Sequence, residues 1–329
     1  MPALDTASDL DFRRTGIGGS DAPLVAGLRA YGKDVFSVYL EKIGQTMPSV
    51  QNEAMGVGHL LEDPLARDWG KRHGRKVRNA TTHVDSVTGK RTRAIRHPRW
   101  PFLFAHLDRL DDEGNILEVK VVNNFKASDF GERDTDQVPP LIALQVHHQL
   151  GVVQSAKRAN IIVLMGGVDR RDYVIERDQE TIDALQTLEV DLWENNIIPR
   201  IPPMLDGSDG ATDFLRQAFP NDDGTEIVAT VADEDWADIF RSADIEIKAL
   251  GARKALAQQH LMDRLAEAST MIGPDFRISY KRAKDSETTH WDRVAGYYAD
   301  EPDYEANVSR FTEVKPGSRR FIFTDRSEA

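Results

Sequence analysis

The chain has 329 residues, 40% of them hydrophobic, which is enough for one large domain or two ordinary ones with a sizeable core. It contains no cysteine, which excludes disulfides, thiolate zinc sites, iron–sulfur clusters and cysteine nucleophiles. No apolar run approaches the ~20 residues of a membrane helix, and the start of the chain has no basic segment followed by an apolar one, as a signal peptide would. We therefore expect a soluble cytoplasmic protein of a bacterium or phage-infected cell, without membrane association.

Charge is distributed unevenly along the chain. The formal net charge is −12, yet the segment from Lys71 to Arg99 holds ten Lys or Arg and a single acid, Asp85. By contrast, residues 178–196 carry six acids and no Lys or Arg. A basic segment of one sign suits a protein that follows a phosphate backbone, although a solubilising strand and loop can have the same composition.

The first predicted elements are two short helices. A glycine-rich turn, Gly16–Ser20, precedes an apolar run, and Ser20 is predicted as the N-cap of the helix that follows. Asp34 and Gly44 enclose a second helix, with Asp34 as its N-cap and Gly44 as its C-terminal stop.

A third helix is predicted over residues 60–73. Leu61, Leu65 and Trp69 recur at a spacing of four residues and therefore form one apolar stripe. Glu62 lies one place off that stripe, at the edge of the apolar face.

The segment Asp111–Asn115 lies between two apolar runs and predicts a β-hairpin. Because side chains alternate across a strand, Glu118 and Lys120 project from one face, and the partner strand can bring Asp108 to the same end. Two carboxylates and an ammonium at the mouth of a sheet are the parts of a magnesium-dependent phosphodiesterase. The carboxylates are hard oxygen ligands, the metal activates water, and the lysine orients that water or stabilises the transition state.

The same spacing also fits a solvated hairpin on which Glu118 and Lys120 pair at the surface. The flanking residues are apolar, however, as expected of core strands, and charged groups on core strands are costly unless they pair or bind a metal. This favours the metal site. The apolar residues are Phe102, Leu103 and Phe104 before the hairpin turn, and Ile116, Leu117, Val119, Val121 and Val122 after it.

The later elements follow from the same patterns. A helix is predicted over residues 139–151, a strand over 160–165 that turns into a second strand, and an amphipathic helix over 178–196. Residues 198–213 are rich in Pro, Gly and Asp and form the best linker candidate. We therefore predict a first domain over residues 1–205 and a C-terminal extension over 206–329.

Within the extension, the sequence predicts long helices and short strands. Residues 233–271 fit one or two long helices with a break at Gly251. A strand over 276–280, a short helix around Trp291 and a final strand over 319–324 follow.

Four separated segments occur in a recognisable order: RTGIGGSDA (14–22), GHLLEDP (58–64), HLD with EVK (106–108 and 118–120), and VPPLIALQ (138–145). Together they resemble the YqaJ-type viral recombinases, relatives of phage lambda exonuclease in the PD-(D/E)xK nuclease superfamily. The resemblance covers roughly residues 13–165. It implies an α/β, restriction-endonuclease-like core with a mixed central sheet flanked by helices. The C-terminal part, with its long helices, short β elements and the ending PGSRRFIF, is similar to an extension carried by many phage and prophage members.

The resemblance implies the metal-binding and catalytic residues. Asp108 and Glu118 match the metal-binding carboxylates, and the backbone carbonyl of Val119 matches a third ligand. Lys120 matches the catalytic lysine. Glu62 matches a helical glutamate that completes the metal site, often through water, and could also be an ordinary helix acid.

Further roles concern substrate. Gln145 matches a glutamine near the attacking water or scissile phosphate, although it could be a structural amide. Arg14 and Ser20 match residues that hold a terminal 5′-phosphate; a guanidinium, a hydroxyl and glycine-exposed amides make an anion site, but Ser20 could act purely as an N-cap. His147 replaces a second glutamine common in the family. We expect His147 and its neighbour His148 to be packing or surface residues, because adjacent positions point about 100° apart on a helix.

The implied activity is a Mg²⁺-dependent DNA exonuclease, with Mn²⁺ as a substitute, that digests linear duplex ends 5′→3′. The 3′ single strand would suit an annealing protein in phage-type recombination, and family analogy suggests a ring-shaped homo-oligomer, often a trimer. The alternatives are a related endonuclease, a Cas4-like end-processing nuclease, or a DNA-end-binding module without catalysis. The missing cysteines argue against an iron–sulfur version.

Overall fold

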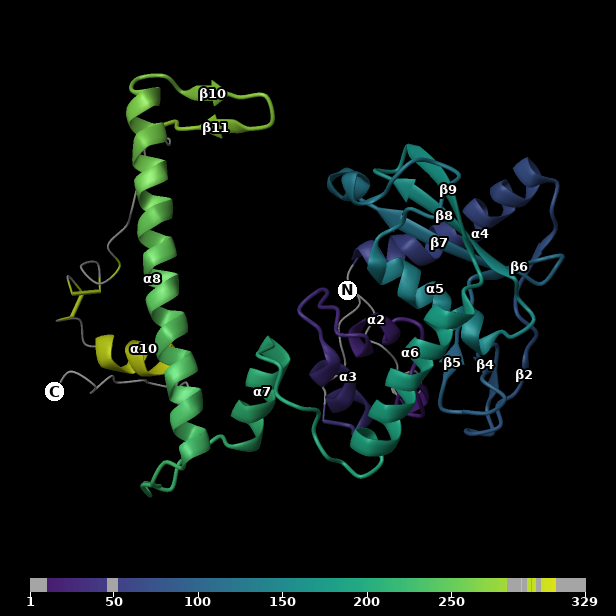
Figure 1. Cartoon of the computed structure of the whole chain (residues 1–329), viewed down its shortest axis with the longest axis horizontal. Coiled ribbons are helices and arrows are strands. Elements are labelled where there is room, and N and C mark those ends of the chain that lie inside the picture. The colour runs from purple at the N-terminus through teal and green to yellow at the C-terminus, as the bar shows by residue number, and fades with distance from the viewer. Residues whose placement is uncertain are drawn as a thin grey trace. The chain divides into compact units, whose positions relative to one another are not determined.

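The computed structural model describes residues 11–45, 53–282, 291, 295–296, 298–299 and 303–311. The chain forms two compact units, Met1–Ala218 and Phe219–Ala329 (Figure 1). In these described ranges, no helix combines the length and the apolar character needed to cross a bilayer.

The centre of the first unit is a mixed five-stranded sheet with the strand order β1-β6-β7-β8-β9. β7 pairs antiparallel with β6 and parallel with β8, and β9 closes the sheet antiparallel to β8. The predicted hairpin around Asp111–Asn115 is therefore confirmed as β6 and β7. The strands are β1 (Val77–Arg78), β6 (Arg109–Asp111), β7 (Ile116–Val122), β8 (Arg158–Met165) and β9 (Asp169–Glu176).

Helices cover both faces of this sheet, as predicted for the mixed α/β core (Figure 1). α4 (Glu53–His73) packs Trp69 against Leu117 and Val119 of β7. On the other face, α5 (Pro140–Val152) and α6 (Gln179–Asp191) join a larger core. Because successive side chains of β7 alternate between the two faces, Glu118 and Lys120 lie on the α5 side.

A second apolar core lies beside the sheet. It joins α2 (Ala22–Val25) and α3 (Val35–Lys42) to Leu103, Ala105 and Leu192. Smaller elements complete the unit: β2 (His83–Val84) with β3 (Arg91–Thr92), β4 (Ile95–Arg96) with β5 (Phe104–Ala105), the 3₁₀ helix η1 (Asn124–Asp129) and the π-helical turn η2 (Leu192–Ile197).

The first unit includes a helix that begins within the segment that the sequence suggested as a linker. α7 (Asp209–Ala218) packs on α3, with the rings of Phe214 and Phe36 5.7 Å apart. Gly210 N–H also donates to Asp34, the N-cap of α3, at 2.9 Å. These contacts explain why the compact unit runs to Ala218, past the boundary predicted at residue 205.

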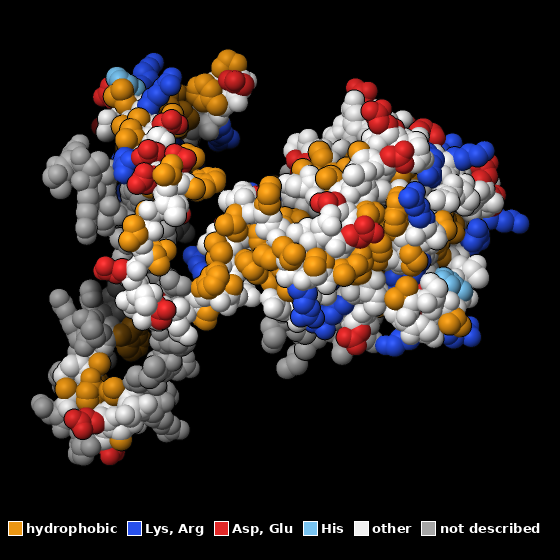
Figure 2. Space-filling view, turned by 60° about the horizontal axis from the view of Figure 1, so that its bottom comes forward, with side chains coloured by type: hydrophobic (Ala, Val, Ile, Leu, Met, Phe, Trp, Pro, Cys, Tyr) orange, Lys and Arg blue, Asp and Glu red, His pale blue; other side chains and the backbone are white. Residues whose placement is uncertain are grey.

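The second unit contains one long helix, α8 (Val231–Leu265), and a hairpin of β10 (Thr270–Ile272) and β11 (Arg277–Ser279). Its remaining described helix is α10 (Tyr304–Phe311). The predicted break at Gly251 is wrong, since α8 continues through it. Trp236 of this helix is 70% exposed. The space-filling view shows hydrophobic side chains among charged ones on the surface (Figure 2).

Helix boundaries show two further differences from prediction. Asp34 caps α3 in a full capping box, as predicted, and Gly44 follows with φ +83°. The N-cap of α2 is Asp21, however, and not Ser20. α4 begins at Glu53, earlier than residue 60. The predicted strand over 319–324 lies outside the described residues, as does most of the helix around Trp291.

Candidate active site

The hairpin turn between β6 and β7 is built by one carboxylate. Asp111 Oδ1 accepts hydrogen bonds from the N–H groups of Glu113 and Asn115 at 3.0 and 2.8 Å, and Gly114 takes the positive φ of +86° that the turn requires. The register pairs Arg109 with Leu117. Asp108, one residue before β6, is thereby brought beside the middle of β7.

Glu118 is the centre of a buried polar cluster. Its side chain is enclosed, with the residue only 3% exposed, and both oxygens accept hydrogen bonds. Oε1 accepts from Lys120 Nζ and from Gln145 Nε2, each at 2.7 Å. Oε2 accepts from Gln149 Nε2 at 2.9 Å. This excludes the alternative of a solvated surface pair between Glu118 and Lys120.

Gln149 was missed at the sequence level. It follows Gln145 by four residues on α5, a spacing that places two side chains on the same helix face. That spacing was the available signal.

Asp108 is hydrogen-bonded to the neighbouring strand β7, and its pKa is raised. Its Oδ2 accepts a hydrogen bond from Val119 N–H at 2.8 Å. Burial, together with repulsion from Glu118 and more weakly from Glu62, raises the pKa of Asp108 to about 8, although the Val119 N–H and Lys120 act in the opposite direction. Converging carboxylates of this kind are relieved by a proton or by a divalent cation.

Lys120 stays an ammonium in this cluster. Burial alone would lower its pKa, but attraction to Glu118 and Asp108 outweighs burial and raises the pKa above its ordinary value. Nζ also donates to Gln145 Oε1 at 3.0 Å. An ammonium in this position can stabilise negative charge or orient a water molecule.

Glu62 stands at the edge of the cluster. It lies on α4 and pairs with His59 Nδ1 at 2.7 Å, while its charge reaches Asp108. Asp63, the next residue, accepts from Arg109 Nη2 at 3.0 Å and so ties α4 to β6. In the described part of the chain, no group of three or more His, Asp or Glu side chains is already arranged to hold a metal. The fold thus brings the carboxylates of Asp108 and Glu118 close together, whereas the nearby Glu62 is paired with His59.

The glycine-rich turn is packed against the strand that leads into β5. Ile17 N–H donates to the Phe102 carbonyl at 2.7 Å, and Phe104 N–H donates to the Ile17 carbonyl at 3.0 Å. A Cβ on Gly16 would lie 1.9 Å from Phe102 O, so this position admits only glycine. On its other side, the turn meets α5, where a Cβ on Gly19 would lie 3.3 Å from Gln145 Cγ.

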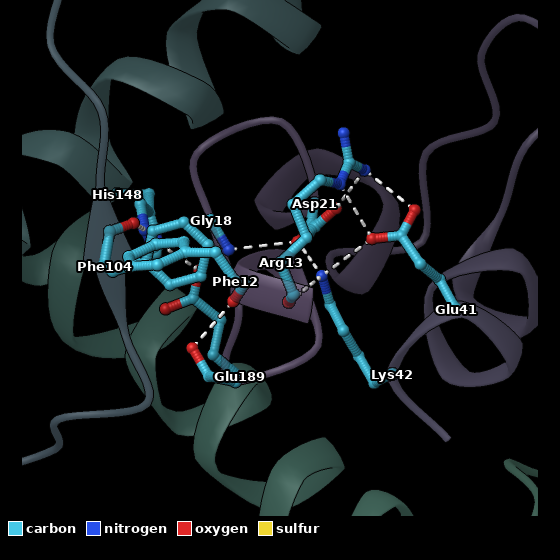
Figure 3. Close-up of polar contacts among 10 residues, drawn as sticks. Phe12, Arg13, Gly18, Asp21, Glu41, Lys42, Phe104, His148 and Glu189 are labelled. Atoms are coloured by element: carbon cyan, nitrogen blue, oxygen red, sulfur yellow. Dashed lines mark hydrogen bonds and ion pairs between the residues drawn. The ribbon is translucent and has the colours of Figure 1, made fainter. Parts of the chain in front are cut away.

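A buried ion pair between Asp21 and Lys42 supports the glycine-rich turn (Figure 3). Asp21 Oδ2 accepts from Gly18 N–H at 3.0 Å and lies 2.7 Å from Lys42 Nζ. Burial opposes the charge on Asp21, but Lys42 and Arg13 outweigh it and hold the pKa of Asp21 below its ordinary value. Arg13 in turn makes two hydrogen bonds to Glu41, at 3.0 and 2.8 Å.

Arg14 and Ser20, the predicted phosphate-binding pair, are not joined by any contact among the described residues. Arg14 lies beside Gly44 at the end of α3, with Nη1 3.7 Å from Asp11 and with Nε buried and lacking a hydrogen bond in the described structure. Ser20 is exposed on the turn. The arginine within the ion-pair network of the turn is Arg13 (Figure 3).

His148 is a buried packing residue, as predicted. Its Nδ1 lies 2.6 Å from Glu189 Oε1 on α6, and its Nε2 lies 2.9 Å from the Phe104 carbonyl (Figure 3). Burial would lower the pKa of His148, but Glu189 outweighs it and raises the pKa. With an acceptor at each nitrogen, the imidazolium form satisfies both sides of the ring. The pair fixes α5 against α6 and β5.

The fold and the site together define an α/β protein with a lysine-bearing acidic cluster on a mixed central sheet. Residues 10–156 match the family model described as the YqaJ-like viral recombinase domain. This confirms the resemblance seen in the sequence.

Comparison with known proteins gives a relative and a solved structure. The chain is 33% identical over 223 residues to the uncharacterized protein YqaJ of Bacillus subtilis (strain 168), a match that covers 67% of this chain and 65% of the relative, just under two thirds of its length. The alkaline exonuclease LHK-Exo of Laribacter hongkongensis, for which a complex with dAMP has also been solved, is similar with 17% identity and a TM-score of 0.45. That similarity covers 65% of this chain and 97% of the exonuclease.

Proposed function

We propose that this protein is a metal-dependent deoxyribonuclease, most specifically a 5′→3′ exonuclease acting on linear duplex ends. The observation that carries the proposal is the buried cluster in which Glu118, beside Asp108, is bound by Lys120 and Gln145. Two carboxylates that repel each other, Asp108 and Glu118, lie beside the ammonium of Lys120. This arrangement fits phosphodiester hydrolysis better than it fits a purely structural role.

Mg²⁺, or Mn²⁺ in its place, is the proposed cofactor. Asp108 and Glu118 would hold it, with the carbonyl of Val119 and the carboxylate of Glu62 completing the set; all are hard oxygen donors suited to such a cation. When bound, the ion supplies an activated water and neutralises charge on the phosphate. The repulsion that raises the pKa of Asp108 is the feature of this chain that fits a divalent cation.

The protein's own groups would then act on substrate around that centre. Lys120 Nζ would stabilise the negative charge that develops on the scissile phosphate. Gln145, whose amide reaches both Glu118 and Lys120, would orient the attacking water or the phosphate. The loss of either polar contact should therefore reduce turnover more than it reduces DNA affinity.

Only part of the basic segment is available for DNA. Arg72, Arg75 and Arg96 pair with acids of the first unit. The remaining exposed cations with no ion pair among the described residues would contact the phosphate backbone, and their contribution should weaken with salt. They are Lys71, Lys76, Arg78, Lys90, Arg91, Arg93 and Arg99.

The glycine-rich turn is proposed to hold the 5′-terminal phosphate, with Ser20 and Arg14 as its side-chain donors. The packing of Gly19 against Gln145 supports this, since an anion at the turn would stand next to the helix that carries the Glu118 cluster. Digestion from a 5′ end leaves a 3′ single strand, which would suit a single-strand annealing protein in phage-type recombination. A ring-shaped homo-oligomer would keep such an enzyme on its duplex.

The decisive experiment compares a 5′-phosphorylated linear duplex with a closed circle of the same sequence, each with Mg²⁺ and with EDTA. An exonuclease releases nucleotides from the linear DNA only, and only with Mg²⁺. Cleavage of circles would instead establish an endonuclease. A shift of the DNA band without cleavage in either form would establish a catalytically silent end-binding module and refute the proposal.

A further inference from the structure

Gln149 has an unusual environment for a helix glutamine. It is 2% exposed, and its Nε2 donates to Glu118 Oε2 at 2.9 Å. Its Oε1 is buried and has no hydrogen-bond partner in the described structure. A buried amide with one unsatisfied atom is unfavourable for folding, so folding alone gives little reason for a glutamine here.

The two oxygens of Glu118 are held by different glutamines of α5. Gln145 shares Oε1 with Lys120, whereas Gln149 is the one described donor to Oε2. Removing Gln149 would therefore free one end of the carboxylate, while removing Gln145 would leave Lys120 on the other oxygen. The two residues are not equivalent, although they share a helix face.

Neighbouring contacts restrict the movement of Gln149. A Cβ on Gly19 would lie 3.5 Å from Gln149 Cγ, so the backbone of the glycine-rich turn lies directly against this side chain. The preceding residue, His148, ties α5 to Glu189 and to the Phe104 carbonyl. These contacts fix both the helix rotation and the direction of the amide.

We propose that Gln149 is a positioning residue, which acts through Glu118 by holding Oε2 so that the carboxylate meets a divalent cation in one orientation. The inference rests on the proposed metal-dependent function and assigns a specific task within it. Residues that hydrogen-bond to metal ligands commonly alter metal affinity or activity by about 10- to 100-fold when replaced.

The test replaces Gln149 with Met, which keeps the length and volume of the side chain but removes the donor. Gln149→Met should lower Mn²⁺ affinity in calorimetry by about tenfold or more. It should also lower kcat on linear duplex DNA while leaving KM for DNA within about twofold. Equal Mn²⁺ affinity in the folded variant and the wild type would overturn the proposal.

A matched control is Gln186→Met. Gln186 is also buried, on α6, and packs against α5 at Gly151, where a Cβ would lie 2.6 Å from its Nε2. It has no described contact with Glu118. This variant removes a buried amide that packs on the same helix and should bind Mn²⁺ like the wild type; an equal loss of Mn²⁺ affinity in both variants would assign the effect to folding and refute the positioning role.

Two outcomes separate this proposal from the wider one. A wild type that binds Mn²⁺ but cleaves no DNA refutes the nuclease and leaves the affinity comparison valid, whereas a wild type that binds no Mn²⁺ refutes both. If Gln149→Met does not fold, the side-chain amide signals of Gln149 in the wild type provide the test by NMR. They should shift on titration with Mg²⁺, and unchanged signals at saturating Mg²⁺ would contradict the inference.

Discussion

The carboxylate of Asp108 accepts a hydrogen bond from the main-chain N–H of Val119, at 2.8 Å. Asp108 is thus positioned by the strand that carries Glu118, and not by the conformation of its own loop alone. Because Val119 directly follows Glu118, the register of one hairpin determines how the two carboxylates stand with respect to each other. A shift of that register by one residue would turn Glu118 and Lys120 to the α4 side.

Lys120→Ala should abolish most DNA cleavage and leave DNA binding largely intact. The ammonium contributes to transition-state charge stabilisation, and loss of one such group lowers kcat by roughly 10²- to 10³-fold. Single-turnover cleavage and gel-shift titration on the same duplex measure the two effects. Lys120→Arg is the matched control, because it keeps the positive charge but changes the geometry of the donor. Full activity of Lys120→Ala would show that this lysine has no part in the mechanism.

Arg14→Gln should remove any preference for 5′-phosphate over 5′-hydroxyl ends. A guanidinium binds a terminal phosphate strongly, while a hydroxyl end offers it little. Initial rates on two duplexes that differ only in this group give the preference, and Arg13→Gln provides the comparison because Arg13 is bound to Glu41 near the turn. A preference that survives Arg14→Gln and disappears in Arg13→Gln would reassign the role.

Asp85→Asn should destabilise the first unit by about 3 kcal/mol, because it leaves Arg96 as a buried charge without its partner. Arg96 Nη2 donates to Asp85 Oδ2 at 3.0 Å, and Thr88 donates to the same oxygen. Burial opposes ionisation of Asp85, yet these partners hold its pKa well below its ordinary value.

The lowered pKa sets the pH dependence of that contribution. It is fully present above the unfolded pKa of about 4 and is lost as the pH falls below that value toward the folded pKa. Urea unfolding at pH 7 and at pH 3.5 would measure it. The exposed Asp136→Asn serves as the control and should change stability by less than about 0.5 kcal/mol; a similar change for both variants would contradict the prediction.

His148 should make the first unit more stable at mildly acidic than at alkaline pH. Its pKa is raised by Glu189 against the effect of burial, with Asp21 also attracting the charge and His97 opposing it. The stabilisation is therefore complete below the ordinary histidine pKa of about 6.5 and is lost as the pH rises through the higher folded value.

Thermal unfolding of the wild type and of His148→Gln between pH 5.5 and 9 would test this. The difference in Tm between them should be largest at the acidic end and shrink as the pH rises. A difference that is constant over this range would show that the pKa of His148 is the same in the folded and the unfolded protein, and would contradict the prediction.

The sequence predicted the hairpin and its charged residues well because each signal was local. Turn chemistry at Asp111–Asn115 and the period of two along β7 sufficed to place Glu118 and Lys120 on one face. Gln149 could not be assigned in the same way, since its role depends on which face of α5 meets the sheet. That choice is made by packing between segments far apart in the chain.

The wrong predictions have comparable physical causes. Ser20 was expected as an N-cap by residue type, but the turn continues through Asp21, which precedes the first helical residue and makes no side-chain capping bond. Gly251 was expected to break α8, yet one glycine costs only about 1 kcal/mol. A helix of 35 residues with a capping box at Thr230 can absorb that cost.

The spacing of the side chains that contact Glu118 and Glu189 along α5 restricts which sequence changes this helix can accept. Gln145 and Gln149 reach Glu118, while His148 between them reaches Glu189. One inserted or deleted residue between positions 145 and 149 would rotate the later side chains by about 100° around the helix axis. The contacts with Glu118 and with Glu189 could then no longer form together. Homologous sequences should therefore differ here by substitution and align without gaps, whatever length variation their loops accumulate.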